Sequence, residues 1–112
     1  MTNINKQALD QILSYFSGMI RNREELECVF TKESKMTTEV RKLGLNDISS
    51  YLSSQGKDFE ITSYSFVKIS DKVVLINGSC VWGNKKSCFT MILNFDTSVH
   101  PAIVTISNLM IL

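Results

Sequence analysis

Side chains that could perform acid–base or nucleophilic chemistry are few in this 112-residue sequence, and they are scattered. His100 is the only histidine. It sits beside Pro101 in a polar stretch, and the sequence pattern brings no serine or cysteine nucleophile to it. Because a catalytic centre needs titratable groups that converge, we interpret His100 as a solvated loop residue and expect no catalytic residues.

The remaining titratable residues have structural explanations. The acidic side chains fall at expected helix starts and strand ends, where helix capping and solvation account for them. The cysteines show no C-x-x-C spacing and no accompanying histidine cluster, so we interpret them as reduced thiols of an intracellular protein. We expect neither a metal nor a cofactor. The acidic residues are Glu24, Glu25, Glu27, Asp58, Glu60 and Asp71, and the cysteines are Cys28, Cys80 and Cys88.

Length and charge restrict the classes of partner. The chain has room for a single domain, residues 1–112, that can bury a substantial core. Twelve basic and eleven acidic residues give a net charge of +1, so no electrostatic case exists for direct binding of nucleic acid or an acidic membrane. The sequence has no signal-peptide pattern and no apolar run near the ~20 residues of a membrane span. We expect a soluble protein.

Residues 72–95, KVVLINGSCVWGNKKSCFTMILNF, predict a long antiparallel hairpin. Gly83 and Asn84 fit a two-residue type II′ turn, which places Trp82 opposite Lys85. One face is then almost wholly apolar, whereas the other mixes apolar and small polar residues without charge, and we expect it to pack on something. The first face carries Val74, Ile76, Phe89, Met91 and Leu93; the second carries Val73, Leu75, Asn77, Ser79, Thr90, Ile92 and Asn94.

The rest of the sequence predicts helices before strands. Apolar spacing predicts a helix over residues 5–20 capped by Asn5, and a capping box at Asn22 and Glu25 opens a second, short helix. Residues 34–43 fit a short exposed strand that is too polar to be buried, and Asn46 caps a third helix to about residue 54. Strands follow at 59–69, in the hairpin and at 102–112. We therefore expect an α+β fold with three N-terminal helices packed on one face of a strongly curved antiparallel sheet.

The last predicted strand extends the mixed face of the hairpin. Alternation assigns Val104, Ile106 and Met110 to one side, and the other side again combines apolar and small polar residues. An uncharged face that continues over three strands favours a sheet-mediated oligomer. The predicted partner-binding residues are Leu75, Asn77, Thr90, Ile92, Thr105, Ser107, Leu109 and Ile111.

The order of these elements and several segments resemble the nuclear transport factor 2-like family. The similar segments are 58–61 (DFEI), 74–79 (VLINGS), 83–86 (GNKK), 89–93 (FTMIL) and 107–110 (SNLM). The resemblance covers nearly the whole chain. It implies a cone-shaped domain that dimerises through its sheet, in agreement with the mixed face.

Within this family the sequence resembles most the small subunit of the messenger-RNA export receptor, whose hairpin tip also reads Gly-Asn-Lys. That resemblance implies a non-catalytic subunit that shuttles between nucleus, nuclear pore and cytoplasm. It would pair with a larger subunit carrying its own domain of the same fold, bind Phe-Gly nucleoporins through the dimer and contact RNA only indirectly. Thr38, Asn108 and Ile111 replace residues typical of the family, a tryptophan, an aspartate and an arginine.

Two alternatives remain open. Glu39 matches an acidic position of the homodimeric import carrier for Ran-GDP, although the segment 78–86 lacks the acids that this carrier places after its glycine strand. A small isomerase or dehydratase of the same cone fold is the other alternative, and it would require two hydrogen-bonded titratable groups in a pocket.

Overall fold

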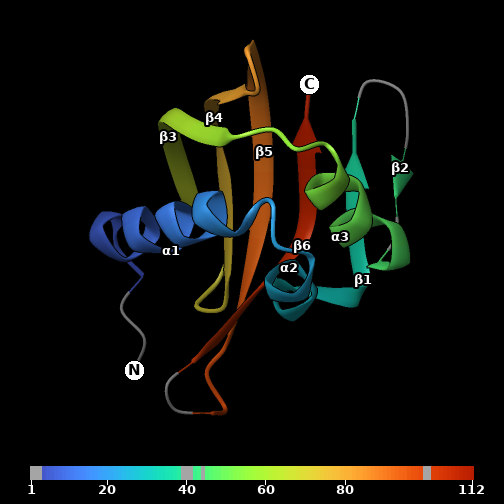
Figure 1. The fold of residues 1–112 in the computed structure, drawn as a ribbon. Coiled ribbons are helices and arrows are strands. Elements are labelled where there is room, and N and C mark those ends of the chain that lie inside the picture. Colours follow the sequence, from blue (N-terminus) through green and yellow to red (C-terminus); the bar gives the residue numbers. More distant parts are fainter. Residues whose placement is uncertain (1–3, 39–41, 44, 100–101) are drawn as a thin grey trace.

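Three helices cover one face of a six-stranded sheet (Figure 1). The computed structural model describes residues 4–38, 42–43, 45–99 and 102–112. The core lies between the helices and the sheet, with side chains such as Leu9, Leu52 and Met91 fully buried. In chain order the elements are α1 (Lys6–Met19), α2 (Arg23–Val29), β1 (Phe30–Thr37), β2 (Lys42–Leu43), α3 (Leu45–Ser54), β3 (Phe59–Lys68), β4 (Val73–Trp82), β5 (Lys85–Asp96) and β6 (Ile103–Ile111).

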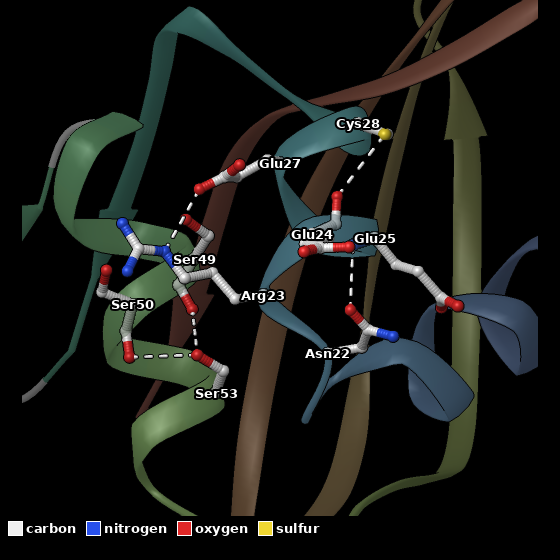
Figure 2. Close-up of polar contacts among 9 residues, drawn as sticks. All are labelled: Asn22, Arg23, Glu24, Glu25, Glu27, Cys28, Ser49, Ser50 and Ser53. Carbon is white, nitrogen blue, oxygen red and sulfur yellow. Dashed lines mark hydrogen bonds and ion pairs between the residues drawn. The ribbon is translucent and has the colours of Figure 1, made fainter.

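The starts of the first two helices follow the predicted caps. The side chain of Asn5 accepts a hydrogen bond from the Ala8 backbone N–H at 2.9 Å. The side chain of Asn22 accepts one from the Glu25 N–H at 3.2 Å, as Figure 2 shows. These bonds satisfy backbone donors that a helix start leaves free. Helix α3 begins at Leu45, two residues before the start that a cap at Asn46 predicts, so Asn46 lies in its first turn rather than at the cap. Sequence signals locate helix ends only to within a residue or two.

The strand order is β2-β1-β6-β5-β4-β3, and the sheet is mixed. All pairings are antiparallel except that of β1 with β6, which is parallel. The expectation of a purely antiparallel sheet is therefore wrong at this one pairing. A tight turn between two strands shows from the sequence that they are antiparallel. Strands β1 and β6 lie far apart in the chain, so no turn fixes their relative direction.

One side of strand β1 is buried and the other is exposed, whereas the sequence predicted an exposed strand. Ser34 and Met36 have no exposed surface. The Ser34 hydroxyl donates to the Ile106 carbonyl at 2.6 Å and accepts from the Thr31 N–H at 2.7 Å, at the irregularity in the β1–β6 register. A buried hydroxyl is tolerated when it is hydrogen-bonded. The polar Ser34 can therefore lie in the core instead of in solvent.

The β4–β5 hairpin has the predicted register. Trp82 pairs with Lys85 and Leu75 pairs with Ile92. Gly83 has φ +66°, and no described non-glycine residue has a positive φ, as a type II′ turn with glycine first requires. The apolar face of the hairpin is buried in the core, as expected.

Strand β6 changes face partway along its length. Leu93 pairs with Ile106, but the preceding residue, Ile92, pairs with Asn108. Ser107 is thus an extra residue, a β-bulge, and it reverses the alternation of every residue after it. Leu109 and Ile111 consequently point into the core, with 1% and 4% exposure. The prediction that they belong to the mixed face is wrong for this reason.

Truncation of β6 side chains tests this change of face. Leu109→Ala should lower the free energy of unfolding by about 2–5 kcal/mol, because it leaves a cavity in a packed core. Met110→Ala removes a side chain that is 38% exposed and should cost much less. Urea denaturation of both variants measures the difference. Equal losses, or a larger loss for Met110→Ala, would contradict the assigned bulge.

Candidate protein-binding surface

The face of the sheet turned away from the helices carries the uncharged residues of the middle strands. We call this surface the outer face. The opposite face contributes the core residues, so the strand register assigns every second residue to the outer face. Its central part comprises Ser65 and Val67 of β3, Val73, Leu75, Asn77 and Ser79 of β4, Cys88, Thr90, Ile92 and Asn94 of β5, and Ile103, Thr105, Asn108 and Met110 of β6; toward the hairpin tip the same face also carries Glu60, Ser63, Val81 and Lys86.

An aliphatic row crosses the centre of the outer face. Val67 pairs with Leu75, Leu75 with Ile92, and Ile92 with Asn108. Val67 is 61% exposed, and Ile103, at the end of the same face, is 51% exposed. Leu75 and Ile92, both partly exposed, continue the row from Val67, and a contiguous apolar row on a surface is suited to protein association.

Five of the eight predicted partner-binding residues lie on the outer face. They are Leu75, Asn77, Thr90, Ile92 and Thr105. Ser107 occupies the bulge, half-buried, and its hydroxyl donates to the Ile92 carbonyl at 3.4 Å. Leu109 and Ile111 are core residues. The sequence reasoning missed Val67 and Met110; the alternation of β3 could have revealed the first, whereas the second depends on the bulge.

A separate apolar pocket of about 370 Å³ lies between helix α1 and strands β5 and β6. Its lining includes two methionines, which adapt readily to the shape of a bound group. Tyr15, on its border, is 68% exposed. Ile12 was expected in the apolar stripe of the helix, but the pocket itself depends on packing. The lining residues are Gln11, Ile12, Tyr15, Phe16, Met19, Val29, Met91, Leu93, Val104 and Ile106.

Tyr64 and Asp10 form a hydrogen-bonded pair between β3 and α1. The Tyr64 hydroxyl donates to the Asp10 carboxylate, and Lys6 lies 3.5 Å from that carboxylate and 5.4 Å from the Tyr64 ring centroid. Burial and the contact with Asp10 raise the pKa of Tyr64 to about 12. The bond from Tyr64 lowers the pKa of Asp10. The raised pKa of Tyr64 and the lowered pKa of Asp10 both lie further from neutral pH than the ordinary values of these groups.

Other predicted features lie elsewhere. His100 and Glu39 fall outside the described residues. Cys80 is buried, Cys28 and Cys88 are exposed, and all three are free thiols. Within the described ranges, no group of histidine, cysteine and acidic side chains is arranged to hold a metal ion. No helix in these ranges has the length and apolar character needed to cross a membrane.

The proteins similar to this chain are found by comparing structures rather than sequences. No protein-family model matches the sequence, and no curated protein matches it. The yeast UBP3-associated protein BRE5 superposes with a TM-score of 0.76 at 17% identity, over 98% of this chain and 97% of that one. Nuclear transport factor 2 from Cryptosporidium parvum does so with a TM-score of 0.63 at 20% identity, over 99% and 98%. The chain has the nuclear transport factor 2-like fold.

A similar fold also occurs in a protein that has been given an enzyme's name. A protein from Novosphingobium aromaticivorans DSM 12444, provisionally assigned as a scytalone dehydratase, superposes with a TM-score of 0.74 at 9% identity, over 94% of this chain and 80% of that one. A fold shared by such different proteins does not specify a function. The choice between binding and catalysis therefore depends on the surfaces described above.

Proposed function

We propose that this protein is a non-catalytic binding subunit that pairs, through its outer face, with a second domain of the nuclear transport factor 2-like fold. The observation that carries the proposal is the uncharged row of Val67, Leu75 and Ile92 across neighbouring strands. A charged patch would remain hydrated, whereas this row gains free energy when a partner removes it from water.

The partner in this proposal is the larger subunit of a messenger-RNA export receptor. The resemblance of the hairpin tip supports this choice over a homodimer. With a net charge of +1, the subunit would contact RNA only through a composite surface with its partner. The protein would then shuttle between nucleus, nuclear pore and cytoplasm.

The apolar pocket offers a place for nucleoporin repeats in the same proposal. Phe-Gly repeats present isolated phenylalanine side chains in a flexible chain. The pocket of about 370 Å³ is lined mainly by aliphatic, aromatic and methionine side chains, which suits the burial of one aromatic ring. It lies on the helix side of the sheet, so pairing through the outer face leaves it open.

The Tyr64–Asp10 pair does not favour the enzymatic alternative. General acid–base catalysis works best when the pKa of the catalytic group lies near the operating pH. Here the pKa of Tyr64 is raised to about 12 and that of Asp10 is lowered. At neutral pH the pair is therefore held as phenol and carboxylate, which suits a tether between α1 and β3.

Affinity purification from the native cell, followed by identification of the bound proteins, tests the proposed partner. We expect a larger protein with its own domain of this fold, in equal amounts. Recovery of self-dimers and Ran alone would reject the export subunit in favour of the import carrier. A stable monomer at micromolar concentration, with no partner recovered, would reject the binding function of the outer face.

A further inference from the structure

Strand β3 forms an open edge of the sheet, because β4 is its only sheet neighbour among the residues that the structure describes. The Gly83 N–H donates to the Asp58 carbonyl at 2.8 Å. Since residues of an antiparallel ladder bond alternately to one side and the other, Glu60 also bonds toward β4. The N–H and C=O groups of Phe59 and Ile61 then face the open edge, where another strand could pair with them.

A groove of about 530 Å³ runs beside this edge, between β3 and helix α1. Its β3 side consists of the six consecutive residues 59–64, and its far side carries the hydroxyls of Ser14 and Ser17. Leu13 and Phe59, both buried, contribute apolar surface to it. The groove therefore combines exposed backbone groups with an apolar floor, which are the two elements that recognise an added strand.

The exposed carboxylate of Glu60 on strand β3 restricts which side chains an added strand can place opposite it. Glu60 is exposed on the side of β3 opposite to the groove floor, and within the described part of the chain it forms no ion pair. Asp10, at the end of the groove, is already paired with Lys6 and Tyr64. Glu60 is thus the acidic group that a neighbouring strand would meet.

We propose that the edge of β3 binds an extended peptide segment of a partner protein by strand addition. The residue opposite Glu60 is basic, because directly opposed charges of unlike sign stabilise a strand pair. The residues on either side of it point to the groove floor and are apolar, because side chains alternate between the two faces. The recognised pattern is therefore apolar, basic, apolar.

This site is independent of pairing through the outer face. The groove lies on the helix side of β3, and strand addition extends the sheet sideways rather than covering it. A bulge between Ile61 and Ser63 bends β3 beyond this point. Pairing is thus limited to the first residues of β3, which sets a short recognition segment.

Selection from a displayed library of random twelve-residue peptides tests the proposal on the whole chain. We expect enriched peptides with the apolar, basic, apolar pattern. Ser14→Trp, which fills the groove from an exposed helix position, should weaken their binding at least tenfold. Glu60→Gln should weaken it about fivefold, the scale of one exposed ion pair. Gln7→Trp, on the same helix but outside the groove, is the matched control and should leave binding unchanged.

Amide hydrogen exchange locates the bound peptide. We expect added protection at Phe59 and Ile61, whose N–H groups face the open edge. Selected peptides that protect only the outer face or the apolar pocket would overturn the proposal, as would peptides whose binding ignores Ser14→Trp. A library that yields no enriched peptide would overturn it as well. Ser14→Trp leaves the outer face unchanged, so its effect on peptide binding is separate from pairing through that face.

Discussion

Leu75→Asp should prevent the proposed pairing through the outer face and leave a folded monomer. Leu75 lies at the centre of the aliphatic row, flanked by Val67 and Ile92, so in the pair its aspartate would be buried without a counter-ion. Removing such a charge from water costs several kcal/mol. The dissociation constant should therefore rise about 100-fold or more. Analytical ultracentrifugation measures the change, and circular dichroism checks that the variant remains folded.

Gln7→Asp provides the matched control for this charge. It introduces the same carboxylate at an exposed position of α1, on the helix side of the sheet, and should leave the dissociation constant unchanged. If Leu75→Asp pairs as tightly as the unmutated protein, the outer face is not the interface. If Leu75→Asp does not fold, Val67→Asp serves as the test instead, because the side chain of Val67 is more exposed.

Gly78→Ala should destabilise the monomer strongly. A Cβ at this position would stand 2.1 Å from the Ser63 carbonyl oxygen and 2.7 Å from the Tyr64 Cα. Both are backbone atoms, so no change of rotamer relieves the overlap, and β3 would have to move away from β4. We expect a loss of about 3 kcal/mol or more in the free energy of unfolding. This corresponds to a fall in Tm of about 10 °C or more, measurable by thermal denaturation.

The control for Gly78→Ala is the same change at Gly18. Gly18 lies in α1, and beyond its chain neighbours and the backbone of its own helix no described atom stands within 4 Å of an added Cβ. Because alanine favours a helix over glycine, Gly18→Ala should raise stability by about 0.5–1 kcal/mol. A neutral or stabilising Gly78→Ala would show that β3 and β4 are not in such close contact.

Local signals in the sequence determined most of the elements. Asn5 and Asn22 marked two helix starts because a cap needs only the next few residues. Gly83 fixed the register of the long hairpin because a two-residue turn places each strand residue opposite a known partner. These features depend on neighbours in the chain, and a single sequence contains them.

Tertiary structure alone decided the features that join distant residues. The parallel pairing of β1 with β6 has no turn to announce it, and the burial of Ser34 depends on a carbonyl 72 residues away. The bulge at Ser107 moved Leu109 from the predicted binding surface into the core. A single extra residue reverses an alternation of period two, and its position is set by the fit of β6 against β5 rather than by any pattern within β6.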